Sequence, residues 1–545
     1  MDGNRFSFTE VEQEFSWYAT GRVNIAYEAV DRHVEEDGRA GEKALFFSDG
    51  QREESYTFGQ LRDYSNKFAN VMKKHGVVKG DRVAVFMPRS PELYISFLGI
   101  LKAGAIAVPM FEAFMEEAVK DRLLSAGAAA VITTPGLRPR FDRQKFPSLR
   151  HVFVVGGCGA LAKGDIQWHN EMTEASREFT PVWVHREDPM FVLFASDANG
   201  RPKGIIHVQN DMIGYLYTGR LVHDLKPGDV YWCTADPGWS TGIVYGFLTP
   251  WLLGIPIVIK GGRFNAEGWY ETLARYKVTV WYSAPTAFRM MMENSEEYLR
   301  QYDLSKLRHI LSVGEPLTGE VLDWSLKYLK QPIFDTWWMS ETGMNMICSL
   351  KNEPVRPGSI GKPIPGIEAA ILDDEGNELP PNHIGNLAIR RGWPAQLRGV
   401  WNNHEEYYRY FRFGDWFVSG DSAYRDKEGY FYFQGRVDSL INTAGERVGP
   451  FEVESKLLEH PAVADAGVTG KPDPLRGEIV KAYVTLNKDY DWTGDLCSEI
   501  RNFVKTGLAA HAAPREIEVR TTIPRTREGK VDRRILKEWA LGHDK

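Results

Sequence analysis

The chain has 545 residues, a length that predicts two to four domains at roughly 150 residues each. Its composition, 43% hydrophobic and 26% charged, is that of an ordinary globular protein. The formal net charge of -7 gives no reason to expect nucleic acid or an acidic membrane as a partner. The N-terminal stretch lacks the apolar core of a signal peptide, and the four cysteines are far apart in sequence. We therefore expect a cytoplasmic protein with reduced thiols.

Apolar runs typical of buried strands alternate with amphipathic stretches through most of the chain. The runs are RVAVFM (82–87), AAAVITT (128–134), HVFVVG (151–156), MFVLFAS (190–196) and IPIVIKG (255–261). The stretches 57–74 and 91–101 have helical periodicity. This alternation predicts α/β layers with largely parallel sheets. From about residue 365, shorter strands with turns such as DDEGNE and DKEGY predict an antiparallel, β-rich subdomain.

One segment reaches the lower length limit for a membrane span. Residues 242–259, GIVYGFLTPWLLGIPIVI, contain no charge. They also contain Pro250, Pro256 and three glycines. We therefore predict a buried helix, a turn at Gly254 and a buried strand.

The last hundred residues predict a small α+β unit. Helical patterns at 454–461 and 498–509 flank the strand-like run EIVKAYVTL (478–486). We place the boundary in the linking segment at Asp438. The expected domains are 1–437, a large N-terminal domain, and 438–545, a small C-terminal domain.

The segment FASDANGRPKG (194–204) follows a strand-like run and has the composition of a phosphate-binding loop. Backbone N–H groups of a glycine-containing turn can receive phosphate oxygens, and a lysine adds a point charge. The spacing is not GxxxxGK[ST], so a P-loop NTPase is not predicted. A polar surface turn is the alternative interpretation.

Three further segments carry polar groups beside apolar runs: DTWWMSETG (335–343), WFVSGDSAYRDKEGYFYFQGRVD (416–438) and PRTREGKVDRRIL (524–536). In the first, Glu341 can hold a divalent cation and Ser340 can contact phosphate. In the second, Asp421 can accept both ribose hydroxyls. Each segment also has a plainer interpretation: core tryptophans near an exposed acid for the first, solvated surface charges for the second and a solvated basic face for the third.

Together, the order and spacing of these segments resemble the acyl- and acetyl-CoA synthetases of the adenylate-forming superfamily. The resemblance covers nearly the whole chain. It is carried by VGEP (313–316), DTWWMSETG, SGD (419–421), GRVDSLINTAGERVGPFEVE (435–454) and PRTREGK. The paired tryptophans and TADPGWSTG (234–242) are most similar to the acetyl-CoA synthetase branch.

The resemblance implies two half-reactions that need ATP, Mg²⁺ and coenzyme A. A carboxylate attacks the α-phosphate of ATP to give acyl-AMP and pyrophosphate, and the CoA thiol then displaces AMP. Catalysis in both steps is mainly positioning and charge neutralisation.

The resemblance also implies roles for individual residues. The catalytic residues are Lys530, Arg447, Ser340 and Glu341, with Glu341 as the Mg²⁺ ligand. The expected nucleotide and CoA contacts are Ser196, Asn199, Gly200, Lys203, Gly314, Glu315, Pro316, Asp335, Thr336, Trp337, Asp421, Arg436, Gly445 and Lys505. The acyl pocket is expected to be formed by Ser240, Thr241, Val313 and Trp338.

Lys530 belongs to the small domain and the nucleotide to the large one. The family rotates the small domain about a hinge residue between the two steps, and Asp438 matches that hinge. We expect the rotation to remove Lys530 and to bring the segment around Gly445 to the CoA tunnel.

A bulky Trp338 closes the expected acyl pocket after two or three carbons. We therefore predict acetate as the substrate and propionate as the second acid, since one methylene discriminates by only about 1–3 kcal/mol. Ser240 replaces the valine usual in acetate enzymes and widens the pocket slightly.

Several alternatives stay open. The chain could be a catalytically impaired homologue that binds nucleotide or acyl-CoA, or an adenylating enzyme for another small acid. The reaction could run in reverse to make ATP. Lys530 sits on a basic loop where related enzymes are acylated, so lysine acylating and deacylating enzymes are possible partners. The oligomeric state is not predicted.

The loop at 194–204 departs from the family norm of about TSGTTGKPKG. Asp197 replaces a glycine, and Ala198 and Asn199 replace hydroxyl residues. Asn199 can still donate through its amide, whereas Ala198 cannot. A weaker grip on the β- and γ-phosphates is therefore expected.

Overall fold

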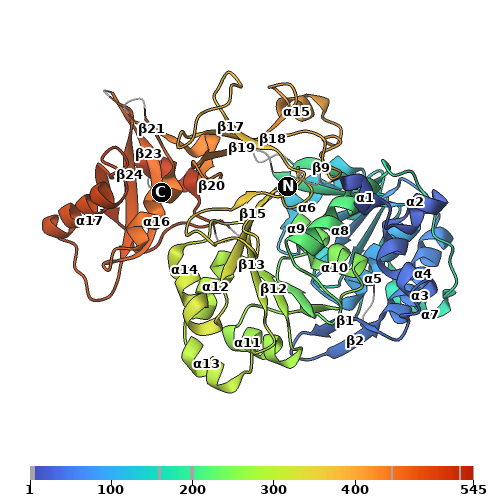
Figure 1. The fold of residues 1–545 in the computed structure, drawn as a ribbon. Helices are drawn as coiled ribbons and strands as arrows, with labels where there is room; N and C mark the ends of the chain where they lie inside the picture. Colours follow the sequence, from blue (N-terminus) through green and yellow to red (C-terminus); the bar gives the residue numbers. More distant parts are fainter. Residues whose placement is uncertain are drawn as a thin grey trace, which may run out of the picture.

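A computed structural model describes residues 7–157, 161–196, 202–443, 446–474, 476–526 and 530–543 of the chain. The side chains of Ser196, Asp438, Asn442, Glu446 and Arg447 lie outside this description. Figure 1 shows a large body that contains the N-terminal and central segments, with the C-terminal segment gathered at one side.

Two large sheets form the main body. In the described residues, the first sheet has seven strands in the order β7 (Ile166–Gln167), β6 (His151–Val154), β5 (Ala130–Thr133), β3 (Arg82–Phe86), β4 (Ile106–Met110), β8 (Pro189–Ser196) and β9 (Pro202–Val208). The second has nine, in the order β16 (Lys362–Pro363), β15 (Ile347–Cys348), β14 (Ile333–Trp337), β13 (His309–Val313), β12 (Val280–Ser283), β10 (Tyr231–Cys233), β11 (Ile257–Lys260), β1 (Lys43–Ser48) and β2 (Glu53–Thr57). The inner strands are parallel and the edge pairs β8–β9, β1–β2, β14–β15 and β15–β16 are antiparallel. The predicted α/β layers are confirmed.

Helices lie between the two sheets and on their outer faces. Among those that contribute to the largest core are α4 (Phe58–Lys74), α5 (Pro91–Lys102), α8 (Met212–Leu221), the π-helical turn η5 (Val244–Leu248) and α10 (Thr249–Leu252). Helix α4 begins with a capping box, in which the Thr57 hydroxyl accepts from the Gln60 N–H at 3.2 Å and the Gln60 side chain accepts from the Thr57 N–H at 2.9 Å. The remaining helices of this body are α1 (Phe8–Glu12), α2 (Ser16–Thr20), α3 (Arg32–Glu35), α6 (Glu116–Ala126), α7 (Trp168–Glu174), α9 (Ser240–Ile243), α11 (Ala266–Arg275), α12 (Pro285–Met292), α13 (Ser295–Gln301) and α14 (Gly319–Trp324).

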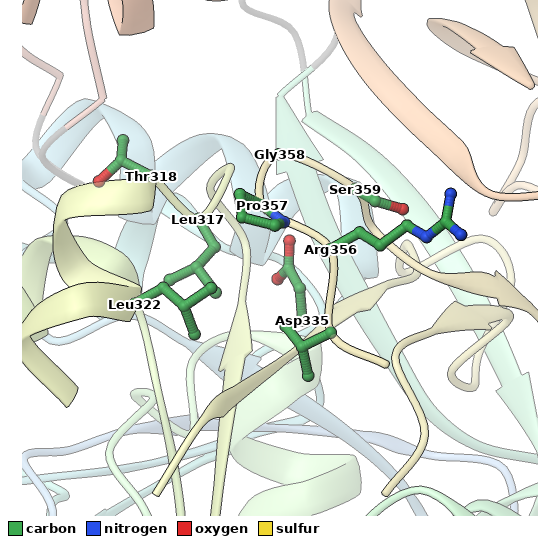
Figure 2. A pocket seen from close by; sticks show the side chains of 9 residues that line it. Leu317, Thr318, Leu322, Asp335, Arg356, Pro357, Gly358 and Ser359 are labelled. Carbon is green, nitrogen blue, oxygen red and sulfur yellow. The ribbon is translucent and has the colours of Figure 1, made fainter. Parts of the chain in front are cut away.

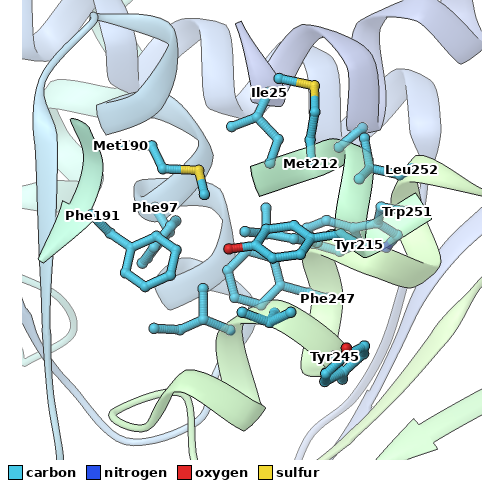
Figure 3. Packing of buried hydrophobic residues seen from close by; sticks show 14 of the residues in the cluster. Ile25, Phe97, Met190, Phe191, Met212, Tyr215, Tyr245, Phe247, Trp251 and Leu252 are labelled. Carbon is cyan, nitrogen blue, oxygen red and sulfur yellow. The ribbon is translucent and has the colours of Figure 1, made fainter. Parts of the chain in front are cut away.

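The uncharged segment 242–259 lies in the middle of this core. Figure 3 shows Phe247, Trp251 and Leu252 from this segment packed with Phe97 of α5, Phe191 of β8 and Tyr215 of α8. The chain then turns at Gly254, whose φ is +67°, and enters β11. The predicted helix, turn and strand are confirmed. Within the described residues, none of the helices is long and apolar enough to cross a bilayer.

Two smaller sheets follow. The first is antiparallel and contains β17 (Ala369–Leu372), β18 (Gly385–Arg390), β19 (Trp416–Arg425) and β20 (Phe431–Arg436), with α15 (His404–Arg409) in the connection between β18 and β19. This is the predicted β-rich subdomain.

The C-terminal sheet contains β22 (Glu446–Val448), β21 (Ile441–Thr443), β24 (Gly477–Leu486), β23 (Val463–Asp473) and β25 (Glu516–Val519). The helices α16 (Pro450–Leu458), α17 (Gly494–Gly507) and α18 (Arg533–Ala540) accompany it, and it has its own apolar core. Both predicted helices of this unit begin four residues earlier than the sequence patterns indicated. A single short turn, Val437–Ser439, connects β20 to β21.

Candidate active site

The candidate residues of the large body gather where parallel strands end. Strands β10, β12, β13 and β14 are parallel, so their carboxyl ends lie at one edge of the nine-stranded sheet. Val313 ends β13 and Trp337 ends β14, and Ser240 and Thr241 begin α9 after β10. Ligands of open α/β sheets bind at this edge.

Strand β14 directs successive side chains to opposite faces of the sheet. On one face, Asp335 lines a small cavity and the Trp337 indole N–H donates to Asp421 Oδ2 at 2.9 Å. On the other face, Thr336 and Trp338 both hydrogen-bond to the Tyr282 hydroxyl, at 2.8 and 3.2 Å. Thr336, expected at the adenine slot, therefore turns its side chain toward Tyr282, on the face opposite Asp335.

Figure 2 shows the Asp335 carboxyl pointing into the cavity between Pro357 and Leu317. Asp335 is only 5% exposed, and burial raises its pKa to about 7. Gly314 precedes the cavity residue Leu317 in the chain and has a φ of +84° in the turn after β13. The Glu315 carboxylate accepts from Thr286 Oγ1 at 2.7 Å and from Arg289 at 3.0 Å, which fixes this turn ahead of Pro316.

Asp421 and Arg436 face each other on the antiparallel strands β19 and β20. Arg436 donates to Asp421 Oδ1 at 2.9 Å, while Trp337 holds the other carboxylate oxygen. Burial raises the pKa of Asp421, an effect that outweighs the opposing charges of Arg436 and Lys530. The carboxylate is thus oriented by two donors, one from each sheet.

Glu341 forms a compact cluster with two residues from other parts of the chain. Lys203 Nζ lies 3.0 Å from Glu341 Oε1, and the Tyr410 hydroxyl donates to the same oxygen at 2.6 Å. Lys203 also donates to the Tyr410 hydroxyl, and Glu406 Oε1 is 4.0 Å from the ammonium. Burial pushes the pKa of Glu341 up, but Lys203 and Tyr410 lower it below its ordinary value. Glu341 is therefore ionised at neutral pH.

This donor set fits a magnesium ion that is shared with a polyphosphate. Mg²⁺ in such sites is held by one or two carboxylates together with phosphate oxygens and water. Glu341 supplies one buried, ionised carboxylate, and a second carboxylate, that of Glu406, lies 4.0 Å from the Lys203 ammonium. Across the part of the chain that the structure describes, no three His, Cys, Asp or Glu side chains converge as a protein-only site would require.

The expected acyl-pocket residues are brought together at the same strand ends. Ser240 and Val313 are buried, and Trp338 is partly buried against the main core. The Ser240 hydroxyl lies 2.8 Å from that of Ser340, so the residue that replaces valine adds a polar contact as well as space. Thr241 follows in α9.

The C-terminal residues are placed less uniformly. Lys530 is exposed beside the Arg525–Val531 bridge, and its positive charge is one of the weaker effects that lower the pKa of Asp421 against the effect of burial. Lys505 is exposed on α17, which Figure 1 shows on the outer side of the C-terminal sheet. In this orientation Lys505 is not brought to the other candidates.

Other predicted contacts fall outside the description. Asn199, Gly200 and Gly445 lie outside the described residues, as do Asp197 and Ala198. For Ser196, Asp438 and Arg447 only the backbone is described. Strands β8 and β9 pair as an antiparallel hairpin, with Ala195 opposite Lys203. A strand, and not the helix of a P-loop NTPase, therefore follows the glycine-containing loop.

Sequence reasoning missed the aromatic residues that support the site. Tyr410 follows α15 and is 69 residues from Glu341, and Tyr282 is 56 residues from Trp338. A tyrosine in an aromatic-rich chain gives no local signal of such a contact, so only the assembled sheets disclose it.

Comparison with known proteins agrees with this geometry. Residues 33–400 match the model of the AMP-binding enzyme family, and residues 452–530 match the AMP-binding enzyme C-terminal domain. The acetyl-coenzyme A synthetase of Bacillus subtilis is 55% identical over 550 residues, which cover 99% of this chain and 96% of that protein. The chain belongs to the acetyl-coenzyme A synthetase family of AMP-binding enzymes.

Solved structures place this family member in the same fold group. A Brucella canis acyl-CoA synthetase is 33% identical, with a TM-score of 0.77 over 99% of this chain and 98% of that one. An anthranilate CoA ligase in complex with anthranoyl-AMP is 29% identical, with a TM-score of 0.86 over 95% of this chain and 98% of that one. The resemblance inferred from the motifs and the predicted fold are confirmed.

Proposed function

We propose that this enzyme activates acetate with ATP to acetyl-AMP and then transfers the acetyl group to coenzyme A. The observation that carries the proposal is that the ionised Glu341–Lys203 cluster and Trp338, whose indole N–H donates to Tyr282, both lie next to the end of β14. We propose that Trp338 ends the acyl pocket at this edge. The similarity to acetyl-coenzyme A synthetase over 99% of the chain supports the same reaction.

In the first step, the large body binds and orients the nucleotide. Asp421 receives the ribose hydroxyls, and the segment 314–316 and Asp335 line the base. Lys203 leaves Glu341 and contacts phosphate oxygens, so its ion pair with Glu341 is replaced by an ion pair with the phosphates of ATP. When Mg²⁺ is bound, it neutralises triphosphate charge and polarises the phosphoryl oxygens. Glu341 would hold it.

The acetate oxygen then forms a bond to the α-phosphorus, and the bond to pyrophosphate breaks. Ser340 and Arg447 contact the α-phosphate, and Lys530 bridges it and the acetate carboxylate. Lys530 thereby stabilises the negative charge that accumulates in the transition state, a contribution of about 3–4 kcal/mol for one such contact.

In the second step, the thiol sulfur of coenzyme A bonds to the acyl carbon and the bond to AMP breaks. We propose a domain boundary at Asp438, within the single turn that joins β20 to β21. Rotation about this turn withdraws Lys530 and brings the segment around Gly445 to the thiol. Contacts of Ser196, Asn199 and Gly200 with phosphate, and of Lys505 with CoA phosphate, belong to the same proposal.

Acetate is the preferred acid and propionate the second, because Trp338 leaves room for a short chain and one methylene discriminates weakly. The enzyme acts in the cytoplasm, where Cys233, Cys348 and Cys497, free in this structure, stay reduced. The exposed Lys530 is accessible to lysine acylating and deacylating enzymes, which would switch off the first step.

Pyrophosphate release tests the proposal. With acetate, ATP and Mg²⁺, a purified enzyme that acts as proposed releases pyrophosphate, and coenzyme A makes the release continuous. No acetate-dependent pyrophosphate would instead indicate the impaired homologue. Preference for a larger acid would indicate an adenylating enzyme of different specificity.

A further inference from the structure

We infer that Tyr282 is a positioning residue that holds the Trp338 indole in place and thereby sets the chain-length limit of the acyl pocket. The inference rests on the proposed function, because it concerns the acid that the same site admits. Tyr282 is a fully buried residue of β12, one strand away from β13 and two from β14.

The direction of each hydrogen bond around Tyr282 follows from its neighbours. The Thr336 hydroxyl donates to the Ser312 carbonyl at 2.7 Å, so its oxygen has only lone pairs to offer. The Tyr282 hydroxyl must then donate to Thr336 Oγ1 at 2.8 Å. Its own oxygen is left to accept the Trp338 indole N–H at 3.2 Å. The indole N–H is thus linked to the sheet by a series of hydrogen bonds in which each donor and each acceptor is determined.

A second tyrosine supports the indole from its side. The Tyr245 ring lies perpendicular to Trp338, with ring centroids 5.0 Å apart. The Tyr245 hydroxyl is fixed in turn, because it accepts from the Asn345 N–H at 2.7 Å and lies 3.0 Å from Thr218 Oγ1. The Thr218 hydroxyl donates its proton to the Gly214 carbonyl at 2.7 Å, so the Tyr245 hydroxyl must donate to Thr218.

A buried histidine completes the support. His223 stacks on Tyr245 with centroids 4.4 Å apart and an interplanar angle of 19°. It bonds to Asn345 Oδ1 at 3.0 Å and to the Tyr231 hydroxyl at 3.2 Å. Burial lowers the pKa of His223 to about 3, so it is neutral, donates to Asn345 and accepts from Tyr231. Tyr245 therefore lies edge-on to Trp338 and is itself supported by the stacked His223 ring.

Loss of the Tyr282 hydroxyl should change the selectivity for the acid more than the rate of catalysis. The Tyr282 hydroxyl is the hydrogen-bond partner of the indole nitrogen of Trp338, the residue proposed to end the acyl pocket. Loss of this oxygen releases the indole to shift or rotate, which enlarges the space for a longer acid. Tyr282 bonds to the Thr336 side chain, on the face of β14 opposite Asp335 and Trp337, and neither tyrosine bonds to Glu341, Lys203 or Asp421. Nucleotide binding should therefore not change.

The test is Tyr282→Phe, assayed as kcat/KM for acetate, propionate and butyrate by pyrophosphate release. We expect the propionate-to-acetate ratio to rise about tenfold, which corresponds to about 1.4 kcal/mol, with the KM for ATP unchanged. The matched control is Tyr270→Phe, which removes an equally buried hydroxyl that donates to the Met291 carbonyl at 2.9 Å, in a different core cluster. The control should leave the ratio unchanged.

A double-mutant cycle separates positioning from general loosening. In a Trp338→Phe background there is no indole N–H, so adding Tyr282→Phe should leave the acid ratio where Trp338→Phe put it. An unchanged ratio in the single variant, or the same tenfold rise in both backgrounds, would overturn the inference while leaving acetate activation intact. If the wild-type enzyme releases no pyrophosphate with acetate, the proposed function fails first and the inference falls with it.

Discussion

Replacement of Asp335 by asparagine should stabilise the protein at alkaline pH and weaken its use of ATP. Asp335 is 5% exposed at the cavity shown in Figure 2, and its carboxyl has a pKa of about 7 against an ordinary value of 3.8. Between these two pH values the folded state binds a proton that the unfolded state releases. The free energy of unfolding therefore falls as the pH rises from about 4 to about 7.

The size of the effect follows from the same two values. Each pKa unit is worth about 1.4 kcal/mol, so ionisation of Asp335 above pH 7 costs the folded state about 4 kcal/mol at most. The amide that Asp335→Asn introduces would carry no charge at any pH, and its oxygen can still accept the Thr336 N–H that Asp335 Oδ1 accepts at 3.0 Å. The variant should exceed the wild type in stability at pH 8 and match it at pH 4.

Thermal unfolding of both proteins from pH 4 to pH 9 measures this difference. We expect the gap in Tm to open through pH 5–7 and to reach a few degrees at pH 8. Because Asp335 is proposed to line the base, the KM for ATP should rise in the same variant, which is a trade-off between stability and function. A gap that does not depend on pH, or a variant less stable at pH 8, would refute the reasoning.

Other consequences of the site can be measured directly. Trp338→Gly should move the preference to acids longer than propionate and leave the Tyr245 ring as the new end of the pocket. A substrate profile of C2 to C8 acids measures this change, and a butyrate preference in the wild type would contradict the argument. Tyr410→Phe removes one donor from Glu341 and should raise the KM for MgATP about 10- to 100-fold, since a hydrogen bond to a charged group is worth about 1.5–3 kcal/mol. An unchanged KM would show that Tyr410 does not prepare Glu341. Lys530→Gln should slow acetyl-AMP formation by about 10²–10³ and spare thioester formation from preformed acetyl-AMP; equal loss in separate assays of the two half-reactions would count against the division of roles. Restoring Gly-Thr-Thr at 197–199 should lower the KM for ATP and slow pyrophosphate release, and unchanged kinetics in both directions would remove the loop as a cause.

The sequence predicted the layers well because each depends on local pattern. The strand-like run HVFVVG became β6, and the amphipathic stretch 57–74 became α4, since an apolar periodicity of two or 3.6 residues is satisfied in only one kind of element. The turn at Gly254 was predictable for the same local reason, because glycine adopts positive φ without strain.

The supports of the site were not predictable in this way. Motifs identified Glu341 and Lys203, but not their direct pairing or the role of Tyr410, which depends on where the connection after β18 returns to the sheet. Thr336 stood in a nucleotide motif, yet the pleat of β14 turns it toward Tyr282. Contacts across strands depend on register, and no single segment of the chain encodes register.

The alternation along β14 also bears on how such enzymes diverge. Adjacent residues here face opposite sides of the sheet: Asp335 and Trp337 on the side of Asp421, Thr336 and Trp338, the residue that follows β14, on the side of Tyr282. In the proposed mechanism these two sides hold the nucleotide and the acid. A substitution at Trp338 can therefore change the acid without disturbing the carboxylate that Trp337 orients. New acid specificities are then accessible by single steps that keep nucleotide chemistry intact, which makes this strand a natural starting point for both evolution and engineering.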